Sequence, residues 1–217
     1  MSEDALQILS AEQWSLLTSR SLGYSEAMSR VSIFIASLTG SVVALALVAQ
    51  ATDFGGEFRA FALVLLPVVF FLGVVTIIRL AQVLWEDGVW VQGLNRIRHA
   101  YLEVAPELEP YFVTSRYDDD TGVLVSSIAR QRVTTPLQGF VSIPGVVAVL
   151  DAVVAGSIAG VATLELGVGA SLAIGAAVFV LTLAVFVALG VWSIAAYRRD
   201  MVVRFPTPPT EGTARSR

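Results

Sequence analysis

The sequence lacks several residue types, and each absence excludes a class of function. None of its 217 residues is Cys, so disulfides, thiolate metal sites and cysteine nucleophiles are excluded. His99 is the only His, which leaves no set of imidazole ligands for a transition metal. No stretch matches the phosphate-binding loop, the dinucleotide fingerprint, the GxSxG nucleophile motif or the HExxH zinc motif. We therefore expect a protein that is not an enzyme and has no cofactor or metal.

Charged residues are also scarce. They make up 15% of the chain, against 55% hydrophobic residues and a mean hydropathy of +0.73, whereas about 25% of the residues in an ordinary soluble domain are charged. All 14 basic residues are Arg. Charges confined to a few segments between long apolar stretches are typical of a polytopic membrane protein, so the lipid bilayer is the first expected partner. The net charge of −4 is small, and we expect no nucleic-acid partner.

Four apolar stretches are long enough to cross a hydrocarbon core, which takes about 20 helical residues. Their charged borders are Arg30 and Asp53, Arg59 and Arg79, Arg132 and Glu165, and Glu165 and Arg198. The connections at 51–60 and 163–170 are short and contain Gly, so each predicts a helical hairpin. The fold class predicted is all-α, with four transmembrane helices in two hairpins and a cytoplasmic helical layer.

This fold divides the chain into five segments. The predicted order is an amphipathic helix at 1–30, hairpin one at 31–85, a helical connection at 86–135, hairpin two at 136–197 and a disordered tail at 198–217. Ser10 to Gln13 form a capping-box pattern that predicts the start of the first helix. The tail is rich in Pro, Ser and Thr, a composition typical of disorder.

The arginines predict the orientation, because they accumulate in cytoplasmic loops. Arg59 alone falls in a predicted outer loop, so both termini are expected to be cytoplasmic. All Trp and Tyr residues fall on the same side as the termini, which predicts a packed cytoplasmic layer. In that layer, span 2 is expected to continue as a helix to about Val104 and to end at Pro106. Its apolar stripe consists of Val83, Trp90, Leu94, Ile97 and Tyr101.

The run NRIRHAYLEVAPELEPYF lies in this projecting segment. It resembles a stretch of uncharacterised four-helix integral membrane proteins of actinobacteria, and the resemblance covers about residues 79–120. The resemblance implies a multi-pass protein of the bacterial inner (plasma) membrane and carries no function with it.

Asp151 is the one charged residue inside a predicted span. A carboxylate at the bilayer centre costs about 2.5–3.5 kcal/mol on insertion scales, and such residues usually face the bundle interior or water. One interpretation is an ion- or proton-binding group near a polar path formed by Ser37 and Ser41 of span 1. Another is a protonated Asp that is hydrogen-bonded to a Ser or Thr of a neighbouring helix. A third is that span 3 begins nearer residue 150, which would place Asp151 close to the interface.

Small residues recur every four positions beside Asp151, at Ala148, Ala152, Gly156 and Gly160. Span 1 repeats the pattern at Ala36, Gly40 and Ala44. Such stripes let helix backbones approach closely, either within one subunit or between subunits. We expect a homo-oligomer.

Several residues near the inner end of span 2 are candidates for a cytoplasmic gate or for lipid or partner contacts. They are Arg79, Glu86, Trp90, Arg96 and Arg98. The Arg79 side chain could reach lipid headgroups or pair with Glu86, and Arg96 and Arg98 could bind anionic lipid. Further along, the Asp118-x-Asp120-x-Gly122 run resembles the start of a calcium loop, but the later ligands are missing. This favours a turn or helix cap.

Two functions remain open from the sequence. One is a homo-oligomeric ion channel or small transporter with Asp151 near the conduction path. The alternative is a membrane-anchored scaffold or partner subunit, which would bind a cytoplasmic protein through the layer around 79–117.

Overall fold

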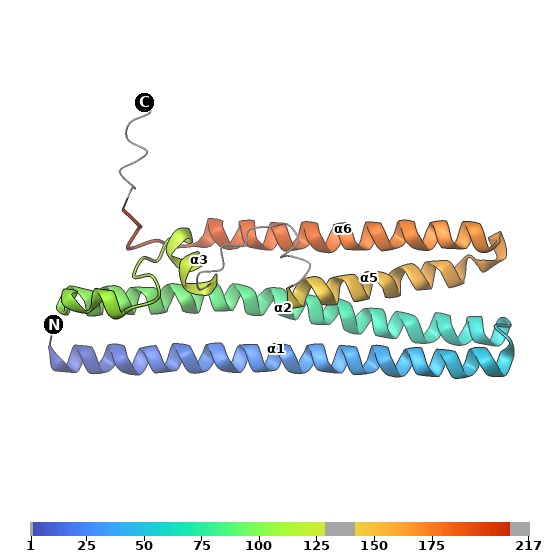
Figure 1. Cartoon of the computed structure of the whole chain (residues 1–217), viewed down its shortest axis with the longest axis horizontal. Helices are drawn as coiled ribbons and strands as arrows, with labels where there is room; N and C mark the ends of the chain where they lie inside the picture. Colours follow the sequence, from blue (N-terminus) through green and yellow to red (C-terminus); the bar gives the residue numbers. More distant parts are fainter. Residues whose placement is uncertain (1, 129–141, 209–217) are drawn as a thin grey trace, which may run out of the picture. The chain divides into compact units, whose positions relative to one another are not determined.

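The computed structural model describes residues 2–128 and 142–208, and within these ranges every regular element is a helix. The elements are α1 (Glu3–Thr52), α2 (Gly56–Val104), η1 (Pro106–Tyr111), α3 (Asp120–Ile128), α5 (Ile143–Ala162), η2 (Leu164–Leu166) and α6 (Val168–Asp200) (Figure 1). The prediction of an all-α chain is confirmed for the described residues.

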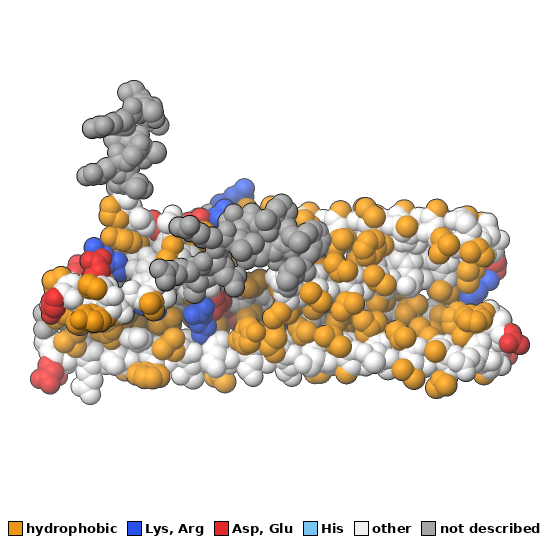
Figure 2. Space-filling model, in the orientation of Figure 1, with side chains coloured by type: hydrophobic (Ala, Val, Ile, Leu, Met, Phe, Trp, Pro, Cys, Tyr) orange, Lys and Arg blue, Asp and Glu red, His pale blue; other side chains and the backbone are white. Residues whose placement is uncertain are grey.

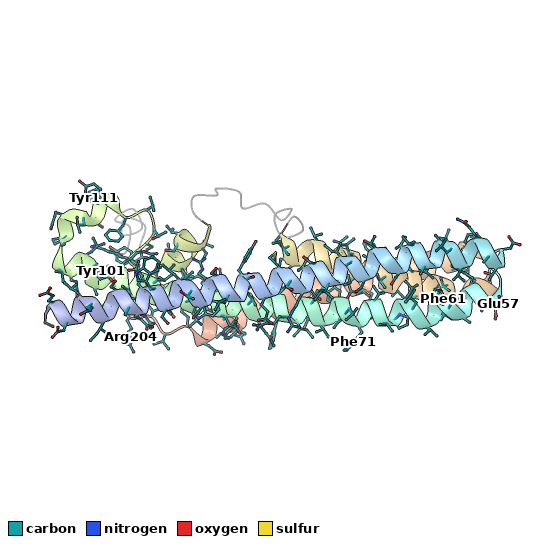
Figure 3. The ribbon with its side chains drawn as sticks, turned by 90° about the horizontal axis from the view of Figure 1, so that it is seen from below. Glu57, Phe61, Phe71, Tyr101, Tyr111 and Arg204 are labelled. Carbon is teal, nitrogen blue, oxygen red and sulfur yellow. The ribbon has the colours of Figure 1, made fainter. Side chains whose placement is uncertain are left out.

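Four of these helices, α1, α2, α5 and α6, are long and apolar enough to cross a membrane. Their most apolar windows have mean hydropathies between 2.1 and 2.9, and no residue in the window of α6 is buried. Figure 2 shows apolar side chains spread over the outer surface of the helices. On α2, for example, Phe71 is 63% exposed (Figure 3). The four apolar stretches predicted from the sequence are therefore present as helices.

The described residues form two compact units. Unit 1 contains residues 2–24, 84–128 and 194–208, and unit 2 contains residues 25–83 and 142–193. Because α1, α2 and α6 are long, each contributes one part to unit 1 and another part to unit 2.

Unit 2 has an apolar core built from α1, α2 and α5. The buried side chains at its centre include Phe34, Ala62, Val69, Val147 and Val154. At the turn between α1 and α2, Asp53 and Phe54 adopt positive φ angles, and the Phe54 N–H donates to the Ala49 carbonyl. Within unit 2, α1 and α2 lie side by side from this turn onward (Figures 1 and 3).

Two glycines bring α5 and α6 together in unit 2. A Cβ on Gly156 would lie 2.7 Å from the Gly175 carbonyl oxygen, and a Cβ on Gly175 would lie 2.8 Å from the Gly156 carbonyl oxygen. Only residues without a side chain allow this approach. Part of the predicted small-residue stripe therefore packs within one chain. Gly40 in α1 differs, because a Cβ added there meets nothing within 4 Å.

The N-terminal helix begins earlier than the capping-box pattern predicts. The α1 helix starts at Glu3 and continues without a break to Thr52, so Ser10 lies inside it. The Ser2 hydroxyl accepts a hydrogen bond from the Ala5 N–H at 3.3 Å, which is the bond expected of an N-cap residue. The predicted start at Ser10 is wrong because an acceptable cap occurs one turn or more before it.

The projecting part of α2 matches its prediction. The helix ends at Val104, and η1 follows from Pro106. Of the predicted apolar stripe, Val83, Leu94 and Ile97 are buried, while Trp90 and Tyr101 are half-buried.

The tail from 198 onward was predicted to be disordered, and this is wrong for its first part. Residues up to Asp200 belong to α6. Residues 201–207 are fixed to the rest of unit 1 by hydrogen bonds given below. The end of the predicted tail, 209–217, and the predicted start of span 3, 136–141, lie outside the described residues.

Candidate functional site

The first candidate site is Asp151 on α5, in unit 2. The helix starts at Ile143, with Ser142 as its N-cap accepting the Gly145 N–H at 3.2 Å and Pro144 in the first turn. Asp151 therefore lies more than two turns inside the helix, and its side chain is completely buried. The helix therefore begins well before residue 150, while the position of the membrane boundary relative to Asp151 stays a prediction.

Gly73 on α2 provides the space that the Asp151 carboxyl group occupies. A Cβ added to Gly73 would overlap the carboxyl carbon and both oxygens of Asp151. Any side chain at this position would compete with Asp151 for the same volume. The role of Gly73 was missed in the sequence, although a lone Gly within an apolar helix is a known sign of close approach.

Neither carboxylate oxygen of Asp151 has a hydrogen-bond partner among the described residues. The hydrogen bond from Asp151 to a Ser or Thr of a neighbouring helix is therefore absent among the described residues. Ser41 is buried and Ser37 is half-buried on α1, but neither is bonded to Asp151. Thr76 of α2 is also buried, and its hydroxyl donates to the Leu72 carbonyl of its own helix at 2.7 Å.

The second candidate site is Asp118, in unit 1, which the sequence indicated only as part of a turn or helix cap. Its side chain is also completely buried. It accepts the Arg96 Nε–H at 2.7 Å, the Phe205 N–H at 2.7 Å and the Arg204 N–H at 3.0 Å. Burial raises the pKa of Asp118, but these hydrogen bonds to the charged form outweigh burial and hold the pKa below its ordinary value.

Asp119 also holds the C-terminal segment. Its carboxylate accepts the Thr207 N–H at 2.8 Å and the Thr207 hydroxyl at 2.9 Å. It accepts the Gly122 N–H at 2.8 Å as well, which caps α3. The interpretation of this acidic run as a helix cap is confirmed. Burial raises the pKa of Asp119, and the hydrogen bonds from Thr207 and Gly122 lower it further than burial raises it.

Polar side chains of α2 complete this network in unit 1. Gln92 donates from one amide nitrogen to the Asp118 carbonyl at 2.8 Å and to the Val202 carbonyl at 3.0 Å. The Arg96 guanidinium also donates to the Val202 carbonyl. We call Val202–Thr207, together with the partners that hold it, the C-terminal clasp. Figure 3 labels Arg204 of this clasp.

His99 and Phe205 add an aromatic contact to the clasp. Their ring centroids are 4.0 Å apart and the rings are inclined by 21°, so they stack. This contact, like the clasp itself, joins residues more than eighty positions apart and leaves no local signal in the sequence.

The arginines predicted to contact lipid or a partner are engaged inside the chain. Arg96 binds Asp118, and Arg98 donates to the Asn95 side chain at 2.7 Å. Burial lowers the pKa of Arg98. A free lipid-binding surface made of Arg96 and Arg98 is therefore not what the structure contains.

Arg79, in unit 2, binds a residue that was not predicted as its partner. Its guanidinium donates to the Glu26 carboxylate at 2.7 Å, and Glu26 also accepts Arg30 at 3.0 Å. Hydrogen bonds from Arg79, and then from Arg30, lower the pKa of Glu26. Glu86 and Trp90 belong to unit 1, where both are half-buried.

One further ion pair joins the turns at the other end of unit 2. Arg59, the single predicted outer-loop arginine, donates to Glu165 at 2.8 Å. The Glu165 carboxylate therefore offsets the charge of Arg59, the one Arg that is not predicted to lie on the cytoplasmic side.

No protein-family model, curated protein or solved structure matches this chain. Function is therefore inferred from the two buried carboxylates and their surroundings.

Proposed function

We propose that this chain is a multi-pass protein of the bacterial inner membrane, with two transmembrane hairpins and both termini in the cytoplasm. Four long apolar helices with mostly exposed apolar side chains support this proposal. The arginine distribution supports the orientation. In this arrangement the apolar segments of α1, α2, α5 and α6 cross the bilayer, and the charged residues at their borders lie outside it.

Within that framework, the protein acts as a homo-oligomeric channel or small transporter for a proton or small cation, and Asp151 is the binding group. The observation that carries this proposal is a completely buried carboxyl group with no hydrogen-bond partner among the described residues. An unpartnered buried polar group costs about 1–3 kcal/mol. A desolvation cost of this size that no hydrogen bond compensates is characteristic of functional sites. Intramembrane carboxylates commonly mark ion or proton pathways.

The oligomer supplies what one chain lacks. In unit 2 the described parts of α1, α2 and α5 pack around an apolar core, so in this proposal the conduction path is formed by contacts between copies. An apolar groove of about 510 Å³ runs along α5 and α6, with Gly156, Gly160 and Gly175 among its lining residues. We propose that this apolar groove, whose glycines already bring α5 and α6 together, is part of the contact between copies.

Flux in reconstituted liposomes tests this function. Asp151→Asn is expected to abolish flux, because it keeps the side-chain volume and removes the ionisable group. Asp120→Asn is the matched control, since Asp120 lies in unit 1 and is exposed. The mass of the extracted particle, corrected for bound detergent, is expected to correspond to several copies. Unchanged flux in Asp151→Asn, or a monomer, contradicts the proposal.

A second function, that of a membrane-anchored scaffold, is favoured by a different observation. Large side chains of α1 in unit 1 are exposed: Trp14 by 70%, Leu22 by 66% and Tyr24 by 58%. In this version a cytoplasmic protein binds the exposed apolar side chains of this part of α1, and not the predicted layer around 79–117. Mild cross-linking is expected to capture a partner with the wild type and to lose it with Trp14→Ala. Capture that is unaffected by Trp14→Ala contradicts this version.

A further inference from the structure

We propose that the species bound at Asp151 is a proton and not a metal cation, and that Gly73 is the positioning residue that encloses the carboxyl group. This inference rests on the proposed function, because it names the species that the intramembrane site would take. Two independent features of unit 2 support it: the shortage of oxygen ligands around Asp151 and the contact with Gly73.

The ligands around Asp151 do not suit a metal cation. Hard cations such as Ca²⁺ take six to eight oxygen ligands, and Mg²⁺ takes six. The described residues contain no group of three or more carboxylate or imidazole side chains that could hold a metal ion. Carbonyl groups within a regular helix are already used by the helix itself. A cation at Asp151 would therefore have one carboxylate and little else.

A proton has no such requirement. Binding forms one O–H bond on the carboxylate, and release breaks that bond and returns the proton to a water or to another acceptor. The neutral acid is tolerated in apolar surroundings, whereas an unpartnered carboxylate there is costly. One enclosed carboxyl group is thus sufficient for a proton site.

No other charged group lies within the helical segments that surround Asp151. The apolar segments of α1, α2, α5 and α6 contain no Asp, Glu, Arg or His apart from Asp151 itself. Their charged borders are Arg30 and Asp53 for α1, Arg59 and Arg79 for α2, and Glu165 and Arg198 for α6. Arg79 follows Gly73 by six residues, a rise of about 9 Å along α2, and its guanidinium is bound to Glu26. Asp151 is therefore the one group whose protonation changes the charge within these apolar segments.

Gly73 determines how tightly α2 covers the carboxyl group. A methyl group at this position would occupy the volume of the Asp151 oxygens, so Gly73→Ala must displace the carboxyl group or move α2 away from α5. Either change alters the environment of the acid. Gly40→Ala is the matched control, because it adds the same methyl group to α1 where nothing lies within 4 Å.

The test is infrared difference spectroscopy of the full-length protein in nanodiscs, titrated with acid and base. The expected result is a carbonyl band of a protonated carboxylic acid that appears and disappears with pH and is absent from Asp151→Asn and Asp151→Ala. Adding Na⁺, K⁺ or Ca²⁺ at constant pH is expected to leave the band unchanged. Gly73→Ala is expected to shift the band or its pH midpoint, and Gly40→Ala is expected to leave both as in the wild type.

Two results overturn the inference: a band at Asp151 that responds to an added cation at constant pH, or the absence of any pH-dependent band that depends on Asp151. A band that is shifted equally by Gly73→Ala and Gly40→Ala overturns the role of Gly73. The proposed function fails separately, if proteoliposomes show no flux while the band titrates as expected. In that case Asp151 binds a proton without conducting it.

Discussion

Asp118 and Asp151 are both completely buried carboxyl groups, yet their surroundings are opposite. Asp118, in unit 1, accepts hydrogen bonds from one guanidinium and two backbone N–H groups. Asp151, in unit 2, accepts none from the described residues. The same residue type at the same burial therefore serves two purposes. The Asp118 carboxylate, whose partners are all supplied, holds the fold together, and we propose that the Asp151 carboxyl group, which has none among the described residues, exchanges a proton.

Substitutions at Asp118 and Asp151 should change the free energy of unfolding with opposite signs. Removing one member of a buried, hydrogen-bonded charge network leaves its partners unsatisfied and destabilises the protein. Removing a polar group that has no partner relieves a cost and leaves nothing unsatisfied. Substitutions at the two positions should therefore change stability in opposite directions.

The largest effect is expected from Asp118→Asn. The amide cannot accept all three donors, so Arg96 and the backbone N–H groups of Arg204 and Phe205 lose a charged acceptor. We expect the free energy of opening of the C-terminal clasp to fall by about 3–5 kcal/mol. Hydrogen exchange of the Arg204 and Phe205 amides measures it.

Asp120→Asn is the control for this experiment. Asp120 binds Arg198 at 3.0 Å, but more than half of each side chain is exposed, so the expected loss is below about 1 kcal/mol. Equal effects of the two substitutions would contradict the role given to Asp118.

Acid is expected to open the clasp in the wild type. The folded-state pKa values of Asp118 and Asp119 are below their ordinary value of 3.8. A depressed carboxyl pKa contributes stability that is present above 3.8 and is lost as the pH falls through the folded-state value. Protection of the Thr207 and Phe205 amides, corrected for intrinsic exchange rates, should remain constant from neutral pH to about pH 5 and decrease below pH 4. Constant protection down to pH 2 would contradict this prediction.

Within unit 2, Gly156→Ala should lower the stability of the fold. The new methyl group would lie 2.7 Å from the Gly175 carbonyl oxygen and 3.1 Å from the Phe179 Cβ, and a backbone atom cannot rotate away. Overpacking of this kind costs about 1–3 kcal/mol. Thermal unfolding in detergent measures the loss. The matched substitution Gly190→Ala, at a position with nothing within 4 Å, should be neutral or stabilising, because Ala favours the helix by about 1 kcal/mol.

At the two buried carboxyl groups, the smaller effect is expected from Asp151→Ala, and it is opposite in sign to that of Asp118→Asn. It removes an unpartnered polar group and leaves a small cavity, so we expect a gain of up to about 1 kcal/mol. The same unfolding measurement applies, with Asp118→Ala as the comparison. A loss as large as that of Asp118→Ala would mean that Asp151 has a structural partner.

Local features of this fold could be predicted from the sequence. The end of α2 at Val104 follows from Pro106, and the buried faces of Leu94 and Ile97 follow from helical periodicity. The four apolar helices follow from the spacing of charges. These features depend on residues within a few helical turns of one another, and sequence patterns indicate structure over that range.

The parts that could not be predicted depend on distant residues. Composition indicates disorder for the tail because it counts Pro and Thr, but Arg204 and Phe205 are fixed through their backbone N–H groups, which composition does not report. The position of Asp151 within a helix could be predicted from Pro144 and Glu165. Its lack of a partner and its contact with Gly73 could not, because both depend on how α2 packs against α5.

The C-terminal clasp also has a consequence for the order in which the chain is completed. The backbone N–H groups that Asp118 accepts come from residues 86 and 87 positions later, so a ribosome makes the carboxylate long before it makes those donors. Both α5 and α6 must be synthesised in between. Until then, Asp118 has Arg96 as its available partner. Unit 1 is therefore completed last, and a chain that ends before Arg204 lacks the backbone donors that hold Asp118 in the clasp.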